Sequence, residues 1–95
     1  MKEVHNNIWD AIEPDRKKSA SFRIRADLMN EVIEKIRAKG YSQTNAAKIL
    51  GISQPRVSNL MNGRISLFST DMLVDMLDAL HLKVEIKVTK PVAYH

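Results

Sequence analysis

The stretch SQTNAAKILGISQPRVSNLMNGR, residues 42–64, decides the fold because it predicts two short helices joined by a tight turn. The first helix is expected over residues 43–50 and the second over residues 54–61. Ser42 and Ser53 precede them, and serine is a favoured N-cap because its hydroxyl accepts a hydrogen bond from a free N–H of the first turn. The mainly α-helical character of the domain follows from this stretch and its flanks.

The residue types in this stretch suit two helices that cross closely. A small residue lets the helices approach, and a glycine supplies positive φ in the turn. A β-branched residue followed three positions later by a larger apolar one fills the core, and a polar residue opens the first helix, where its amide can reach a phosphate. This pattern is typical of a helix-turn-helix. The residues in these roles are Ala47, Gly51, Val57, Leu60 and Gln43.

Two longer amphipathic segments flank the stretch. One spans residues 21–39, and its apolar residues recur with helical period: Ile24, Leu28, Val32, Ile33 and Ile36. The start of this segment is ambiguous between strand and helix, because apolar and polar residues also alternate in SFRIRA. The other helix follows the N-cap Ser69 and ends at Leu80. Its apolar face consists of Met72, Leu73, Met76, Leu77 and Leu80, opposite Asp71, Asp75 and Asp78.

Residues 82–88 change to the two-residue period of a half-buried strand. The alternating apolar residues are Leu82, Val84, Ile86 and Val88. One strand needs a partner, so we expect these residues to pair with their copies in a two-fold dimer. Centring the pair on Glu85 would oppose like charges, whereas centring it on Val84 or on Ile86 opposes lysine and glutamate. The sequence leaves these last two registers open.

The N-terminal residues 1–20 read as a lightly structured arm. Its apolar residues Ile8, Trp9 and Ile12 predict one helical turn before Pro14, which would be the fifth helix of the protein. Trp9 would either fold onto the domain or anchor a partner protein. The expected organisation is therefore an arm over 1–20, a helix-turn-helix domain with its dimerisation strand over 21–90, and a tail over 91–95.

The charge of the chain is concentrated in its middle. The 95 residues have a net charge of +4. Residues 1–20 are neutral, residues 21–65 carry eight bases against three acids, and residues 66–95 carry three bases against four acids. No acid occurs between Glu34 and Asp71, which marks a candidate footprint for a polyanion. That window contains Lys35, Arg37, Lys39, Lys48, Arg56 and Arg64.

Composition argues against several other classes of protein. The chain has no cysteine, so it offers no disulfide, thiolate metal site or cysteine nucleophile. It has neither the h-region of a signal peptide nor a membrane-length apolar run. The histidines His5, His81 and His95 are scattered, without a metal-ligand or catalytic spacing. We therefore expect a cytoplasmic protein, associated with the nucleoid when bound to DNA, that is not an enzyme and has no cofactor or metal.

The stretch over residues 42–64 resembles the phage-repressor (Cro/XRE) class of helix-turn-helix domains. The resemblance rests on the five helix-turn-helix positions above and on the closing Asn62-Gly63-Arg64. Pro55 departs from it, because the class usually has a polar or small hydroxyl residue there. The following RISLFSTDMLVDMLDALHLKVEIKV, residues 64–88, resembles the end of HigA-type antitoxins, in which the last helix runs into a strand.

The resemblance and the residue types agree on a reading surface. The helix over residues 54–61 would enter the major groove, where glutamine and asparagine suit adenine and arginine suits guanine. Pro55 retains apolar contact with a thymine methyl. Arg56 and Gln43 also have simpler interpretations, as a solvated arginine and as a helix-terminal hydrogen-bonding group. The expected base contacts are Gln54, Pro55, Arg56, Ser58 and Asn59, and the expected phosphate contacts are Ser42, Gln43, Thr44, Lys48, Asn62 and Arg64.

These features predict a homodimeric repressor that binds a palindromic double-stranded operator. The HigA resemblance further implies the antitoxin of a type II toxin–antitoxin module, with a RelE/HigB-type toxin as partner. Two alternatives are a solitary or phage-type regulator, and an interaction module whose main task is to neutralise a toxin. A steep loss of DNA affinity with rising salt would favour the regulators, and a small basic protein encoded next to this one would favour the toxin–antitoxin module.

Overall fold

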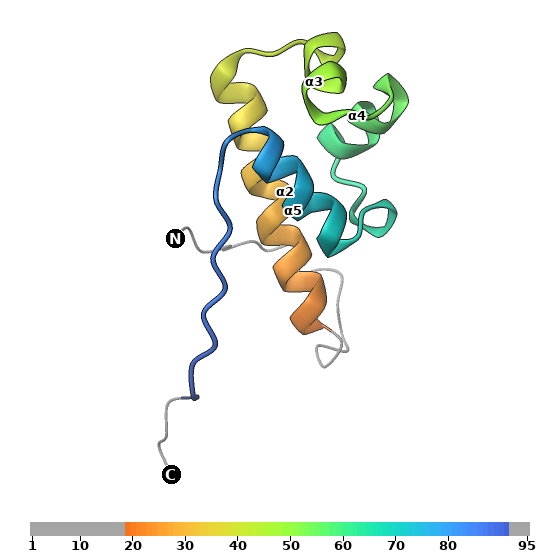
Figure 1. Ribbon diagram of the computed structural model, residues 1–95. Helices are drawn as coiled ribbons and strands as arrows, with labels where there is room; N and C mark the ends of the chain where they lie inside the picture. Colours follow the sequence, from red (N-terminus) through yellow and green to blue (C-terminus); the bar gives the residue numbers. More distant parts are fainter. Residues whose placement is uncertain (1–18, 92–95) are drawn as a thin grey trace.

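The computed structural model describes residues 19–91, which contain four α-helices and one short 3-10 helix. In Figure 1, α2 and α5 lie side by side, and α3 and α4 pack together at one end of this pair. The 3-10 helix η2 connects α4 to α5. In chain order the elements are α2 (Ser19–Lys39), α3 (Gln43–Leu50), α4 (Gln54–Met61), η2 (Ile65–Leu67) and α5 (Thr70–Ala79).

The three predicted N-caps are confirmed. The Ser42 Oγ accepts a hydrogen bond from the Asn45 N–H at 3.0 Å, and the Ser53 Oγ accepts one from the Arg56 N–H at 3.3 Å. The Ser69 Oγ accepts one from the Met72 N–H at 3.1 Å. Each bond satisfies a donor that the first helical turn leaves free. As a result, α3 and α4 have the predicted bounds.

The turn between α3 and α4 also follows the prediction. Gly51 has φ +69°, and its N–H donates to the Ala47 carbonyl at 2.9 Å. A side chain at this left-handed position would be strained. The turn therefore uses glycine to reverse the chain within two residues of the end of α3.

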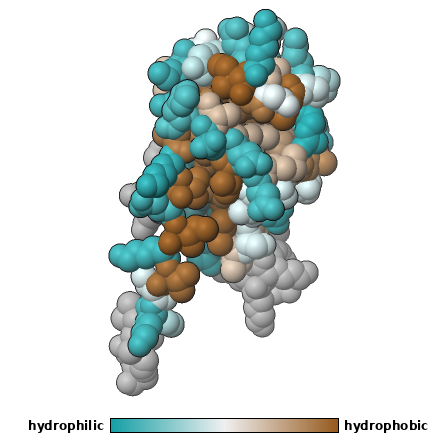
Figure 2. Space-filling model, viewed as in Figure 1, coloured by the Kyte–Doolittle hydropathy of each residue, from teal (hydrophilic) through white to brown (hydrophobic). Residues whose placement is uncertain are grey.

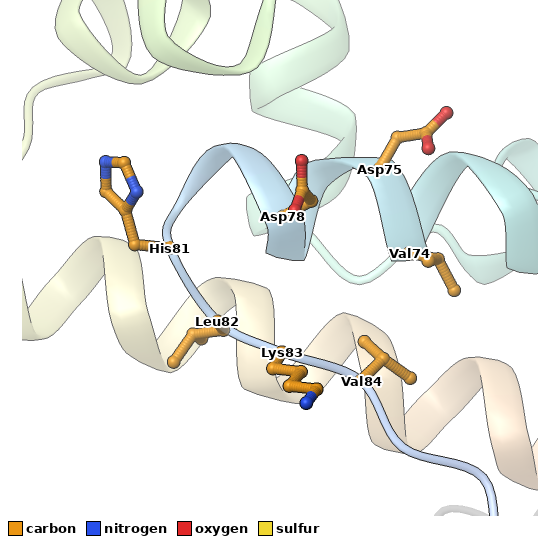
Figure 3. A pocket seen from close by; sticks show the side chains of 7 residues that line it. All are labelled: Val74, Asp75, Asp78, His81, Leu82, Lys83 and Val84. Carbon is orange, nitrogen blue, oxygen red and sulfur yellow. The ribbon is translucent and has the colours of Figure 1, made fainter.

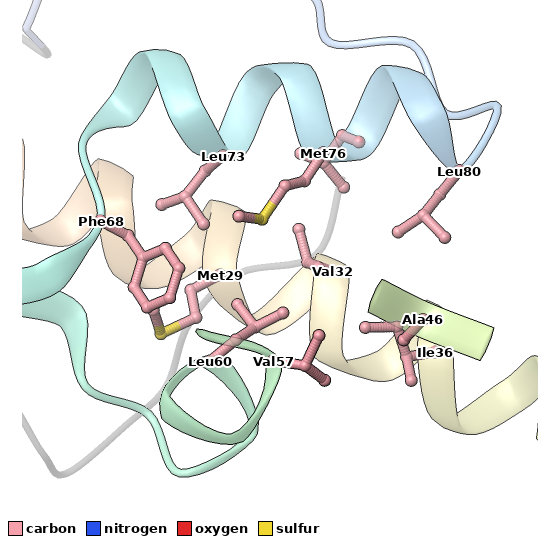
Figure 4. Packing of buried hydrophobic residues seen from close by; sticks show 11 residues of the cluster. Met29, Val32, Ile36, Ala46, Val57, Leu60, Phe68, Leu73, Met76 and Leu80 are labelled. Carbon is pink, nitrogen blue, oxygen red and sulfur yellow. The ribbon is translucent and has the colours of Figure 1, made fainter. Parts of the chain in front are cut away.

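The core lies where α2, α3, α4 and α5 meet (Figure 4). The expectation for α2 needs correction at Ile24, which is 52% exposed. The first turns of α2 extend past α5 (Figure 1), so no other described helix covers that position. On α3 the fully buried small residue is Ala46, and Ala47 is half-buried. The buried residues are Met29, Val32, Ile36, Ala46, Val57, Leu60, Phe68, Leu73, Met76, Leu77 and Leu80.

The N-terminal boundary is also earlier than expected. The ambiguous segment after residue 18 is helical, and α2 begins at Ser19 instead of near Ser21. The helical turn predicted at Ile8, Trp9 and Ile12 lies outside the described residues. The five-helix expectation thus becomes four α-helices within residues 19–91.

The predicted strand over residues 82–88 is not formed in the single chain. Residues 82–91 have no regular secondary structure and run back beside α2 (Figure 1). A strand requires a second strand to which it can hydrogen-bond. The segment SFRIR, which the sequence suggested as a possible second strand, is part of the helix α2. Leu82 and Val84 are half-buried, whereas Ile86 is 84% exposed and Val88 is 90% exposed. We call residues 82–91 the C-terminal segment.

The turn that starts the C-terminal segment is a helix cap of the Schellman type. The His81 N–H donates to the Asp78 carbonyl and the Leu82 N–H donates to the Leu77 carbonyl, both at 2.9 Å. His81 takes the left-handed position, with φ +65°, where glycine is usual. These two bonds direct the chain back along the body of the protein.

Candidate nucleic-acid interface

Helix α4 is anchored by one face and presents the other to solvent. Val57 and Leu60 are both 0% exposed and fix the helix against the core. Pro55 lies three residues before Ser58 and four before Asn59, so these three side chains share the opposite face. Pro55 is exposed, and Ser58 and Asn59 are half-buried. The outer face of α4 therefore has only small or uncharged polar side chains.

The first turn of α4 adds an exposed amide to this face. Gln54 is the first residue of the helix and is exposed. Pro55 is the second residue of the helix and has no backbone N–H to donate. The N-terminus of α4 consequently has one donor fewer for an anion than an ordinary helix.

The N-terminus of α3 provides a second group of exposed polar residues. Gln43 and Thr44 are exposed, and Lys48 is exposed in the last turn of the helix. Ser42 is occupied by its capping role, because its hydroxyl also donates to the Asn45 Oδ1 at 3.0 Å. The first turn of α3 contains no acid, so the partial positive charge of the helix terminus is not neutralised there.

The turn after α4 places two more predicted residues at the surface. The Gly63 N–H donates to the Leu60 carbonyl at 2.9 Å, and the Arg64 N–H donates to the Asn59 carbonyl at 3.1 Å. These bonds satisfy the last carbonyls of α4. The side chains of Asn62 and Arg64 are exposed, so both are available to an external partner.

The guanidinium of Arg56, unlike the side chains of the other predicted contact residues, packs against a neighbouring part of the protein. One of its guanidinium nitrogens donates to the Leu67 carbonyl at 3.3 Å, and the guanidinium carbon lies 4.9 Å from the centre of the Phe68 ring. The same nitrogen is 3.8 Å from the Met72 Sδ. Arg56 thus connects the start of α4 to η2 and to the start of α5. The sequence contained a signal for this, because Arg56 precedes the buried Leu60 by four residues and shares its side of the helix.

Arg56→Ala is expected to destabilise the fold by about 1–2 kcal/mol. The substitution removes a charged hydrogen bond and a cation–π contact, which together contribute about this much at a partly exposed site. The melting temperature should fall by several degrees. Arg64→Ala, which removes an exposed arginine, is the matched control and should change stability by less than ~0.5 kcal/mol. Equal melting temperatures for the two variants would contradict the role given to Arg56.

No acidic residue lies on α3 or α4. Asp71, Asp75 and Asp78 are exposed on α5, and the last two line a groove beside the C-terminal segment (Figure 3). The remaining acids of the described chain are on α2 and in the C-terminal segment. The acid-free window found in the sequence thus contains the whole of α3 and α4.

Residues 19–91 contain no group of three or more histidines or carboxylates that could hold a metal ion. None of the helices in this range has the length and apolar character to cross a membrane. The candidate site is the exposed polar surface of α3 and α4, which contains no acidic residue.

Comparison with known proteins places the chain in a family. A family model described as a helix-turn-helix domain matches residues 12–89. A solved structure named as an XRE-family transcriptional regulator is 34% identical, with a TM-score of 0.73 over 78% of this chain and 83% of that one. A search of the curated proteins found no match. The chain belongs to the XRE class of helix-turn-helix proteins.

Proposed function

We propose that this protein is a sequence-specific DNA-binding transcriptional regulator that inserts α4 into the major groove. The observation that supports this is the division of α4 into two faces. Val57 and Leu60 are wholly buried and fix the helix, while its outer face has uncharged hydrogen-bonding groups and no acid. Such a helix can approach base edges without repulsion from the phosphates.

The outer face of α4 suggests how the bases are read. The amides of Gln54 and Asn59 suit bidentate contacts with adenine, and Ser58 can donate to a base or sugar. Pro55 would pack against a thymine methyl group. Arg56 would have to leave Phe68 and the Leu67 carbonyl to reach guanine. We therefore propose that Arg56 positions α4 and that the other four residues contact the bases.

The proposed phosphate contacts come from α3 and from the turn after α4. Gln43 and Thr44 are exposed at the N-terminus of α3, where free N–H groups and the helix dipole favour an anion. Lys48 and Arg64 supply positive charge, and Asn62 adds an exposed amide. Ser42 would contribute through its backbone and its cap. These contacts would fix the register of the protein on DNA.

The test is to select a preferred DNA sequence from a random library and measure its affinity at several salt concentrations. Affinity should fall steeply with salt, because phosphate contacts release counterions. Asn59→Ala should weaken binding by about 1–3 kcal/mol and relax selection at one base pair. Asn30→Ala, which alters an exposed asparagine on α2, should leave both unchanged. Unaltered selection by Asn59→Ala would refute the groove assignment.

We propose further that the regulator binds a palindromic operator as a homodimer. Two copies of α4 would then read half-sites about 34 Å apart, one turn of the double helix. Such a protein acts at the chromosome, so its proposed location is the cytoplasm, with the nucleoid when bound to DNA. The surface that joins the two copies is considered in the next subsection.

The finer role that we propose is that of an antitoxin which binds its own operator. The resemblance of residues 64–88 to HigA-type proteins supports this, and the exposed acids of α5 would complement a small basic toxin of the RelE/HigB type. Co-purification with the product of an adjacent reading frame tests it. If no such protein binds, the chain is a solitary or phage-type regulator. If a toxin binds and no DNA does, its main task is neutralisation.

A further inference from the structure

The C-terminal segment has an inner half that is seated on the protein and an outer half that is not. Leu82 and Val84 pack against the core, whereas Ile86 and Val88 are almost fully exposed. The Lys83 Nζ lies 3.5 Å from the Glu85 Oε2, and both side chains are exposed. The segment thus already alternates apolar and charged residues between two sides. Figure 2 shows the apolar side as a brown band that continues from the body into the segment.

A groove lies along each side of the inner half. On the α5 side, Val74 is accompanied by Asp75, Asp78 and His81 (Figure 3). The groove on the α2 side is more apolar, and carboxylates lie along it. Its lining consists of Leu28, Leu77, Leu82 and Val84 with Asp27, Glu31, Lys83 and Glu85. The apolar residues of this groove could contact apolar side chains of a second strand, and its carboxylates could attract basic ones.

We propose that the occupant of the α2-side groove is residues 86–90 of a second copy of this chain, paired antiparallel with residues 82–86 about a two-fold axis through Ile86. The exposed residues of this stretch have suitable chemistry, since Lys87 and Thr89 alternate with Ile86 and Val88, and Lys90 follows on the same side as the two apolar residues. Ile86 would face its own copy, and Val88 would lie opposite Val84 of the other chain.

The same register matches charges outside the groove. Lys87 of one copy would lie opposite Glu85 of the other, once on each side of the axis. Lys90 would lie opposite Leu82, beside the groove whose lining includes Glu31. The two bodies then lie on one side of a two-stranded ribbon, and each strand rests partly on its own body and partly on its neighbour.

The exposures distinguish this register from the alternatives. Centring the pair on Val84 would cover Ile86 but leave Val88 without an opposite strand residue, because its counterpart would be Leu80, which ends α5. Centring it on Glu85 would oppose two glutamates. The axis through Ile86 covers both highly exposed apolar residues with apolar partners and opposes no like charges.

This inference deepens the proposed function, because it supplies the surface through which two reading helices are joined. It concerns the dimer and not the DNA contacts, and so it can fail separately. A monomer that binds a single half-site would overturn the pairing and leave DNA reading intact. A dimer that is paired through Ile86 and binds no DNA would support the pairing and refute the proposed function.

The decisive experiment uses single cysteines, because the natural chain has none. Residues that face each other across antiparallel strands have Cα atoms about 4.5–5.5 Å apart, within the range of a disulfide. Under mild oxidation Ile86→Cys should form a covalent dimer in high yield. Glu85→Cys and Val84→Cys should not, because their copies would be displaced by about 7 and 13 Å along the strands. Preferential cross-linking of either control would overturn the register.

A charge exchange provides an independent check. Glu85→Lys places two lysines opposite each other and should raise the dimer dissociation constant by at least about fivefold. Adding Lys87→Glu restores opposite charges and should return the constant to within about twofold of wild type. Light scattering at micromolar concentration measures both. A monomeric wild-type protein, or a double variant no better than the single one, would refute the pairing.

Discussion

Gln54→Glu is expected to weaken binding to the selected operator about 100-fold while leaving the fold at least as stable. The carboxylate replaces the amide donor at a base edge, and the loss of one bidentate contact costs about 1–3 kcal/mol. It also introduces a negative charge among the phosphates. In the free protein the same charge lies in the first turn of α4, where it interacts favourably with the helix dipole, by about 0.3–1 kcal/mol. Fluorescence anisotropy and thermal unfolding measure the two effects.

The opposite signs of these effects make the prediction specific. Asn30→Asp is the matched control, because it makes the same amide-to-carboxylate change at an exposed position of α2. It alters the net charge equally and should reduce DNA affinity by no more than about twofold. If both variants lost affinity to the same extent, net charge would explain the result, and α4 would not be the reading helix.

Phe68→Ala is expected to cost about 3–5 kcal/mol of folding free energy. Phe68 is 1% exposed and lies between η2 and α5, where its ring contacts the core and the Arg56 guanidinium. A domain of this size has a total stability of about 5–15 kcal/mol. The variant should therefore unfold at a much lower urea concentration than wild type, or be largely unfolded at 37 °C.

The neighbouring residue provides the control for this prediction. Leu67 is 44% exposed, so Leu67→Ala should cost less than about 1 kcal/mol. Urea unfolding monitored by circular dichroism compares the two variants directly. Similar midpoints would mean that Phe68 is not the residue that closes the core at this loop.

The sequence predicts most of the structure where local chemistry is decisive. Ser42, Ser53 and Ser69 cap helices as expected, because a side-chain oxygen at an N-cap acts on the next three residues alone. The bounds of α3 and α4, and the burial of Val57 and Leu60, follow equally from local period and spacing. The sequence therefore predicts the two helices of the candidate site, except that Ala46 and not Ala47 is the fully buried small residue of α3.

The features that the sequence misses depend on parts of the chain that are far apart. The environment of Arg56 requires Leu67 and Phe68, eleven and twelve residues later, and periodicity does not place a loop against a helix. The exposure of Ile24 depends on where α5 begins beside α2. The strand predicted over residues 82–88 is not formed, because the described chain offers it no second strand to pair with. In each case the outcome depends on surroundings that the local residue pattern does not encode.

The turn at His81 has a consequence for the entropy of association. Its two backbone bonds and its left-handed residue fix the direction in which the chain leaves α5. Leu82 and Val84 are consequently already ordered on the body before any partner arrives. Ordering a residue costs about 1–2 kcal/mol of backbone entropy. In the proposed dimer, folding would already have met this cost for the inner half of the C-terminal segment. A second copy would have only the short outer half to order.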